Sequence, residues 1–335
     1  MTAAEPVRAV ADAVLYEGYI LWPYRRSALK NTRRWTFGGV HPPGWSVAHP
    51  DDASEIQTQC LLEAPGGTPI DVRLRFLHVV GRQVLRRGAT GWVAVDELES
   101  ADGQRWLTWD EAAERELALP ALHAGTGIAR IGCDVAIPAG RAREEVAGGA
   151  GALERTWQRL DATVELTCER LAAELYRVTV RLANTTPFAG SLREDALRRT
   201  LVSTHTVLQV PAGAFVSMTD PPGDLREHAS ACCNVGTWPV LAGEEGEQDL
   251  LLSSPIILPD HPQIAPESPG DLFDGGEIDQ LLVLNILSLT DEEKAEMRAT
   301  DPRAREILDR TAALSEEELL RLHGAIREFG TVRGF

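Results

Sequence analysis

Histidine and cysteine residues in the second half of the chain have the types and spacing that metal binding requires. His228 and Cys232 stand four positions apart in the stretch HASACC at residues 228–233, so on a helix they share one face, as two ligands of one ion must. His205 lies one expected strand before them and His261 one expected strand after them. Because thiolate and imidazole suit late first-row metals, these four residues predict a site for zinc, nickel or iron.

A role in packing is the competing interpretation of the same four residues. No spacing in the sequence defines them as one set, and cysteine is a common small core residue. A lone histidine on a strand usually makes ordinary hydrogen bonds. The sequence favours this second interpretation, in which the protein holds no metal cofactor.

Acidic residues around His261 form a second candidate group. Asp260, Glu267, Asp271 and Asp274 lie in a proline-rich stretch, where carboxylates could act in acid–base chemistry or bind a hard cation. Asp274 also has the spacing of a helix cap, and acidic loops before helices are normally solvated. We therefore expect no catalytic residue in this group.

The sequence motifs of the large enzyme classes are absent. The chain contains no HExxH, GxSxG, GKS or GKT sequence and no EF-hand pattern, and residues 125–130 (GTGIAR) lack the third glycine of a dinucleotide fingerprint. The sequence therefore predicts a protein that is not itself an enzyme.

Residues 14–40 combine aromatic and basic side chains at an unusual density. Aromatic residues favour a pleated, half-buried surface, and Pro23 suits a strand edge, so the segment is expected to begin as a strand. It could pack its rings on a core and leave a solvated basic turn. It could also be a binding surface, since arginine and aromatic residues are typical interface anchors. The candidates for partner binding are Trp22, Tyr24, Arg25, Arg26, Lys30, Arg34 and Trp35.

Alternating apolar and polar residues predict a set of antiparallel strands. The period of two is clearest at residues 70–76 and in the pair 162–169 and 176–182, which predicts a hairpin. Residues 56–63 are expected to pair with residues 70–76 in another hairpin. Further strands are expected at residues 92–98, 128–137 and 201–210. Many strands separated by turn residues predict an antiparallel β-sandwich or open barrel.

Two stretches in this region have more than one interpretation. Residues 109–117 (WDEAAEREL) fit a long strand or a short helix. Residues 147–152 (AGGAGA) are flexible enough for a hairpin loop or a boundary between domains.

The C-terminal region carries start signals for helices. Residue pairs 274/277, 290/293 and 315/318 have capping-box spacing, and Asp301 precedes Pro302 as an N-cap precedes an N1 proline. An apolar stripe marks residues 319–329 as a one-sided helix, whereas residues 278–287 have almost no polar face. That apolar helix is either central to its subdomain or a second candidate surface for a partner. The predicted class is thus mainly β with a helical end. Its expected parts are an aromatic and basic arm (1–50), an antiparallel β domain (51–270) and a helical subdomain (271–335).

The net charge of −17 is concentrated in the C-terminal part of the chain. Residues 201–335 hold 9 Lys and Arg against 24 Asp and Glu, which leaves a net charge of only −2 for residues 1–200. Such acidity repels phosphate backbones and argues against nucleic acid as a partner, although the basic cluster at residues 25–34 could meet an acidic protein. The five cysteines are odd in number and contain no CxxC, which fits a reducing compartment. No apolar run is long enough to cross a membrane, so we expect a cytoplasmic location.

Several stretches resemble one group of proteins. Residues 16–31 (YEGYILWPYRRSALKN) and 34–38 (RWTFG) are similar to uncharacterised proteins associated with actinobacterial-type NiFe-hydrogenase gene clusters, as are residues 203–205, 258–268 and 301–310. The resemblance implies a cytoplasmic accessory factor that binds a protein client, either a hydrogenase subunit or a maturation factor. It supplies no catalytic residues. The alternative from the histidine and cysteine residues is a metal-binding β-sandwich enzyme or a metal carrier.

Overall fold

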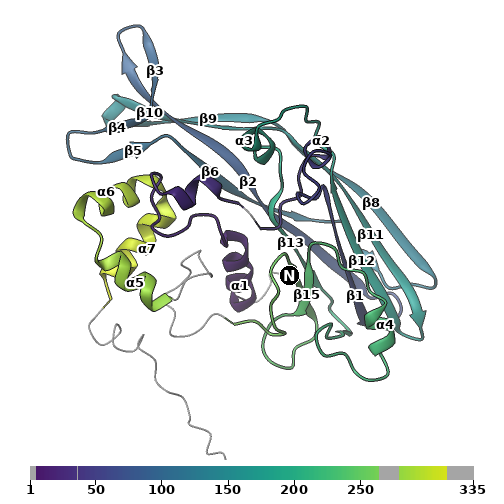
Figure 1. The fold of residues 1–335 in the computed structure, drawn as a ribbon. Coiled ribbons are helices and arrows are strands. Elements are labelled where there is room, and N and C mark those ends of the chain that lie inside the picture. Colours follow the sequence, from purple (N-terminus) through teal and green to yellow (C-terminus); the bar gives the residue numbers. More distant parts are fainter. Residues whose placement is uncertain (1–4, 36, 264–278, 315–335) are drawn as a thin grey trace, which may run out of the picture.

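The computed structural model describes residues 5–35, 37–263 and 279–314. Within these ranges the protein is mainly β, with antiparallel sheets and C-terminal helices (Figure 1). Two large sheets pack face to face and are not closed into a barrel. The predicted class, an antiparallel β-sandwich or open barrel followed by helices, is therefore confirmed.

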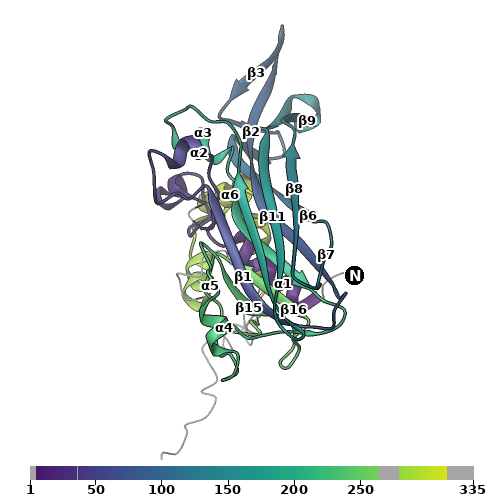
Figure 2. The same ribbon diagram turned by 90° about the vertical axis from the view of Figure 1, so that its right-hand side faces the viewer.

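The first sheet has five strands in the order β14-β1-β12-β11-β8, and Figure 2 shows β11 and β8 running side by side. The strands are β1 (Glu55–Glu63), β8 (Ile128–Ile137), β11 (Leu160–Ala172), β12 (Leu175–Asn184) and β14 (Ala214–Phe215). The predicted hairpin is confirmed, because β11 and β12 pair with Cys168 opposite Val178. Val164 and Leu166 are buried on the inner face, as the alternation predicted.

The second sheet is organised around β2, a strand of 20 residues. Its path is β15-β16-β13-β2-β10-β9, and β3, β6 and β7 also pair with β2. The strands are β2 (Pro69–Gly88), β3 (Gly91–Val95), β6 (Trp109–Ala118), β7 (Leu122–His123), β9 (Gly140–Val146), β10 (Gly151–Trp157), β13 (Val202–Gln209), β15 (Trp238–Leu241) and β16 (Leu250–Ser254). β4 (Glu97–Glu99) and β5 (Arg105–Leu107) form a separate two-stranded sheet.

The pairing of β1 with β2 was predicted wrongly. β1 pairs with β12 and β14 in the first sheet, and β2 lies in the second sheet. Alternation identifies which face of a strand is apolar, but it does not identify the neighbouring strand. Of the two ambiguous stretches, residues 109–117 belong to strand β6, and the glycine-rich stretch contains the short helix η2 (Ala147–Gly149) in the loop between β9 and β10.

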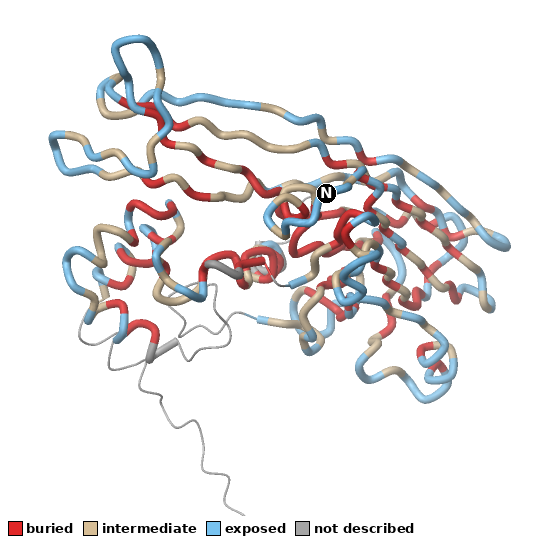
Figure 3. Tube along the Cα trace, turned by 45° about the horizontal axis from the view of Figure 1, so that its top comes forward, coloured by how far each residue is buried: buried red, intermediate tan, exposed pale blue. Residues whose placement is uncertain are grey.

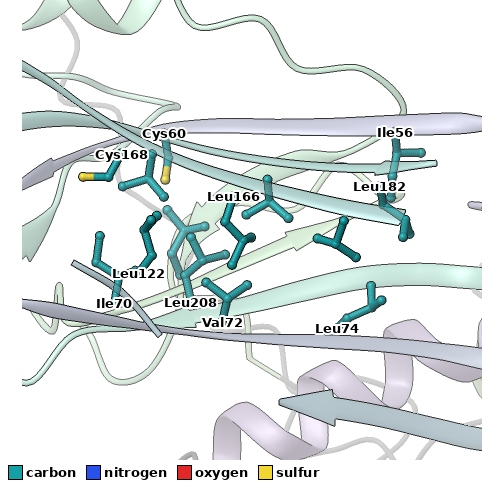
Figure 4. Packing of buried hydrophobic residues seen from close by; sticks show 14 of the residues in the cluster. Ile56, Cys60, Ile70, Val72, Leu74, Leu122, Leu166, Cys168, Leu182 and Leu208 are labelled. Carbon is teal, nitrogen blue, oxygen red and sulfur yellow. The ribbon is translucent and has the colours of Figure 1, made fainter. Parts of the chain in front are cut away.

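The main core lies between the two sheets. Inner-face residues of β1, β11 and β12 meet inner-face residues of β2 and β13, and Figure 4 shows Leu166 of one sheet near Leu208 and Val72 of the other. These side chains are almost completely buried. Burial of each one stabilises the fold by roughly 1.5–3 kcal/mol relative to exposure, so the alternating pattern is the main determinant of the sandwich.

The N-terminal segment does not form the predicted strand. It begins as helix α1 (Glu5–Tyr16), which buries Val10, Ala11, Val14 and Leu15 on one helical face. This spacing of i, i+1, i+4 and i+5 is helical, and the buried face packs on β13 and β2. Irregular turns then lead to the short helices η1 (Leu29–Arg33) and α2 (Pro43–Ser46). Tertiary packing of the aromatic residues overrides their strand preference here.

A second core lies on the outer face of β2. It joins residues of the N-terminal segment, such as Tyr19 and Tyr24, to Leu77 and Val79 of β2 and to apolar residues of the C-terminal helices. Those helices are α5 (Asp279–Leu287), α6 (Asp291–Thr300) and α7 (Pro302–Ala312), and Figure 1 shows them beside β2 and β6. As a result, residues 74–80 of β2 are all buried, so both faces of the strand are covered there. Figure 3 shows buried stretches in the long strands and in the helices beside them.

The helix start signals are confirmed where the structure describes them. Thr290 and Glu293 form a reciprocal capping box at α6, and Asp301 caps α7 by accepting a hydrogen bond from the Arg303 N–H at 2.8 Å. In α5, Leu282, Val283 and Ile286 are buried in the second core. The signals at residues 274/277 and 315/318 and the stripe at residues 319–329 lie outside the described residues.

Two further short helices, α3 (Arg193–Leu197) and α4 (Arg226–Ser230), lie in connections between strands. Over the described parts of the chain, none of the helices is long and apolar enough to cross a membrane.

Candidate binding cleft

Several arginine and aromatic residues of the N-terminal segment are buried and make contacts within the protein. Of the seven residues predicted to bind a partner, Tyr24, Arg34 and Trp35 are buried. Trp22 is half-buried and packs edge-to-face on Tyr24, with ring centroids 5.9 Å apart. Tyr24 and Trp35 belong to the second core, and Trp22 packs against it. A partner could therefore reach this segment only through its more exposed residues, such as Arg25, Arg26 and Lys30.

Arg34 is stacked between two indole rings. Its guanidinium carbon lies 3.6 Å from the ring centroid of Trp109 and 4.3 Å from that of Trp35. It donates to the backbone carbonyl oxygens of Tyr19 at 3.4 Å and Asp110 at 2.7 Å. A planar guanidinium can stack and donate in its plane at the same time, which explains why arginine fits this position.

The basic turn after Tyr24 meets an acidic helix of the same chain. Arg25 forms an ion pair with Glu293 of α6 at 3.0 Å and lies 3.9 Å from Glu296. The Ser27 N–H and hydroxyl both donate to Glu296 at 3.0 Å. From the sequence, the basic cluster was expected to meet an acidic protein, and in the structure part of it pairs with acidic residues of the same chain.

Arg26 and Lys30 lie farther out than the buried residues. Arg26 donates from one guanidinium nitrogen to the carbonyl oxygens of Asp96 at 3.3 Å and Thr108 at 3.2 Å, which ties the segment to the start of β6. Lys30 is exposed. Arg26 therefore has the position to serve both the fold and a ligand.

A cleft opens where the N-terminal segment, β6 and α3 meet. Its volume is about 420 Å³. The lining residues are Arg26, Asn31, Arg34, Trp35, Thr108, Trp109, Asp110, Arg193, Glu194 and Leu197. Three of the seven predicted partner-binding residues, Arg26, Arg34 and Trp35, belong to this set.

Hydrogen-bond donors outnumber free acceptors in the cleft. Both carboxylate oxygens of Asp110 accept from Arg198, at 3.1 and 3.3 Å, and the Asn31 side chain is bonded to the backbone of residues 21 and 25. In contrast, the indole N–H groups of Trp35 and Trp109 have no hydrogen-bond partner among the described residues. Both nitrogens are themselves buried, and a buried donor without an acceptor costs about 1–3 kcal/mol.

Arg34 is also a buried cation without a carboxylate. Its side chain is 7% exposed, and in the described ranges no Asp or Glu oxygen lies within 4.0 Å of it. Burial lowers the pKa of its guanidinium to about 10, against the opposing effects of Tyr19, Asp110 and Asp301. Buried charges are normally paired, so the stacking and the two carbonyl bonds compensate this charge only in part.

The predicted metal ligands are not brought together as one set. No group of three or more His, Cys, Asp and Glu side chains that could hold a metal ion occurs in the part of the chain that the structure describes. His205 is completely buried on β13, close to Arg75, and its Nδ1 lies 3.1 Å from the Ser203 carbonyl oxygen. Burial lowers its pKa to about 4.

The other three predicted ligands lie in two different places. His228 is in α4, and the Cys232 thiol donates to the His228 carbonyl oxygen at 3.6 Å, so these two residues do lie one turn apart. His261 lies elsewhere, after β16, and its backbone N–H donates to the Leu241 carbonyl oxygen at 2.8 Å. Its neighbour Asp260 accepts from the Ser217 and Thr219 hydroxyls, as a loop-organising carboxylate does.

Four important residues of the cleft were not identified from the sequence. Trp109 and Asp110 come from the start of β6, and Arg193 and Leu197 come from α3. They lie about 70 to 170 positions from Arg26 and Arg34 in the sequence, and no motif links them. Only a knowledge of the tertiary fold could have placed them together.

No protein-family model matches this chain, and no curated protein matches it either.

Proposed function

We propose that the protein is a non-catalytic accessory protein that binds a protein client at the arginine–tryptophan cleft. The observation that carries the proposal is the arginine-rich lining of the cleft, in which Arg26, Arg34 and Arg193 lie beside the indole rings of Trp35 and Trp109. Arginine and tryptophan are the residues most enriched at the energetic centres of protein interfaces. The half-buried Arg193 and Arg26 are the side chains that a client would reach first.

The resemblance of residues 16–31 and 34–38 supports a hydrogenase subunit or hydrogenase maturation factor as the client. A cytoplasmic location is part of this proposal, and five free cysteines are compatible with it. The acidic charge of the molecule supports a protein client over nucleic acid.

Co-purification from the native host tests the proposal. We expect the tagged protein to capture a hydrogenase subunit or maturation factor. The double variant Arg26→Glu/Arg193→Glu should capture at least about tenfold less of it, because charge reversal removes two donors. Arg130→Glu is the matched control, since Arg130 is 67% exposed on the outer face of β8 and away from the cleft. Equal capture by all three proteins, or no hydrogenase component in any of them, would show that the proposal is wrong.

A further inference from the structure

The polar groups that line the cleft favour one kind of ligand group. Trp35 and Trp109 line the cleft with indole rings, which cannot accept a hydrogen bond. Arg26, Arg34 and Arg193 add guanidinium N–H groups, which are donors only. The ligand group must therefore be an acceptor with several lone pairs.

Charge narrows the ligand group to an anion. The cleft carries three arginines against Asp110 and Glu194, and Asp110 is already paired with Arg198 at 3.1 Å. The buried Arg34 guanidinium has no carboxylate within ion-pairing distance in the ranges that the structure covers. An oxyanion at this place would pair with a charge that the fold buries and would accept from guanidinium N–H groups.

The rest of the molecule sets an upper limit on the ligand's charge. With a net charge of −17, the protein repels polyanions, so the cleft favours a compact group with a single negative charge. A volume of about 420 Å³ falls in the range of small-molecule sites. Leu197 and the two indoles supply apolar walls beside the donors.

From these observations we propose that the cleft binds a carboxylate group attached to an apolar or aromatic body. Arg193 and Arg26 contact the carboxylate from the accessible side, Arg34 lies on its buried side, and the indole rings contact the apolar body. The carboxylate could belong to a free small molecule or to the end of a client's chain. If the carboxylate belongs to a client's chain, this inference rests on the proposed function.

Tryptophan fluorescence of the full-length protein can test the carboxylate preference. Benzoate is the probe, benzamide is its uncharged counterpart, and inorganic phosphate is an anion without an apolar body. We expect saturable quenching by benzoate and binding at least about tenfold weaker for the other two, because each lacks one of the two recognised features. Trp109→Phe should remove most of the signal. Equal binding of benzoate and benzamide would overturn the inference.

Variants of the two accessible arginines test the site itself. Arg193→Gln and Arg26→Gln should each weaken benzoate binding about tenfold or more, and Arg130→Gln should leave it unchanged. Arg193 also donates to the carbonyl oxygens of Arg34 and Trp35, at 3.2 and 3.4 Å, so thermal melting must show that each variant is folded. Wild-type affinity in both folded variants would place benzoate elsewhere and refute the inference.

A pair of short apolar peptides identifies the source of the carboxylate and separates this inference from the proposed function. Competition with benzoate by a peptide with a free C-terminal carboxylate, but not by its amide, supports a client's chain end. If benzoate binds and no client is captured, the carboxylate site is correct and the proposed function is wrong. If the client is captured and benzoate and benzamide bind equally, the proposed function stands and the carboxylate inference is wrong.

Discussion

Arg34 shows how one buried side chain joins the N-terminal segment to the sheet. Its guanidinium lies between the indoles of Trp35 and Trp109, which come from the segment and from β6. It also donates to the carbonyl oxygens of Tyr19 and Asp110, again one from each element. The same group that fastens the segment also lines the cleft, so a ligand bound there would stabilise the attachment of the segment as well.

His205 should make the protein less stable in acid. Burial and nearby Arg75 lower its pKa to about 4, although Glu116 and the Ser203 carbonyl oxygen oppose this shift. Between its ordinary pKa of about 6.5 and pH 4, the unfolded chain binds a proton that the folded chain does not. The contribution is complete above pH 6.5 and declines as the pH falls to about 4, by on the order of 3 kcal/mol in all.

Urea unfolding at a series of pH values measures this effect. His205→Gln should flatten the dependence of the unfolding free energy on pH between 6.5 and 4, whatever it does to stability at pH 7. His123→Gln is the control, because His123 is exposed. His78 is also buried, with a pKa lowered to about 4 by burial and by Arg115, so part of the slope should survive in the variant. An unchanged slope would contradict the prediction.

Helix α7 is attached to the N-terminal segment through its own cap. Asp301 accepts from the Arg303 N–H at 2.8 Å and from the Tyr19 hydroxyl at 2.6 Å. Tyr19→Phe should lower the unfolding free energy by about 1–3 kcal/mol, because it leaves one buried carboxylate oxygen without its donor. Tyr176→Phe is the matched control, since Tyr176 is also buried but its hydroxyl has no hydrogen bond to the described residues. Equal melting temperatures for the two variants would contradict this account.

Local signals in the sequence predicted elements better than they predicted neighbours. The period of two located β8, β11 and β12, and the caps at Thr290 and Asp301 located α6 and α7, because each signal involves residues close together in the chain. The pairing of β1 and the course of the N-terminal segment depend on distant contacts. Tyr16, for example, donates to Glu114 across 98 positions, and no local pattern encodes that contact.

Part of the cleft was predictable for the same reason. Composition singled out Arg26, Arg34 and Trp35, because they are concentrated in one short segment. Trp109 and Arg193 are isolated in their own segments and become significant only when β6 and α3 bring them beside Arg34. The fold also joins the two oppositely charged segments, since Arg25 of the basic segment pairs with Glu293 of the acidic C-terminal region.

The two ends of the described chain share one core, and this bears on the predicted division into three parts. α5, α6 and α7 contribute Leu282, Met297 and Ile307 to the second core, which they share with α1 and with the outer face of β2. An independent helical subdomain would need a core of its own. We therefore expect that the C-terminal helices cannot be removed without damage to the β domain.

Truncation at residue 263 tests this expectation. Each large side chain that leaves the second core removes roughly 1.5–3 kcal/mol of burial, and several leave together, which approaches the whole stability of about 5–15 kcal/mol that a domain has. The truncated protein should melt at least about 10 °C lower, or fail to fold, and should bind a hydrophobic dye through exposed Leu77, Val79 and Trp109.

Two substitutions in α5 provide the matched comparison for the truncation. Leu282→Ala should cost about 2–5 kcal/mol, because Leu282 is 1% exposed, whereas Leu284→Ala should cost far less, because Leu284 is 45% exposed. A truncated protein with the wild-type melting temperature and no dye binding would contradict the shared core. The helices would then be a separate subdomain, as the division at residue 271 predicted from the sequence.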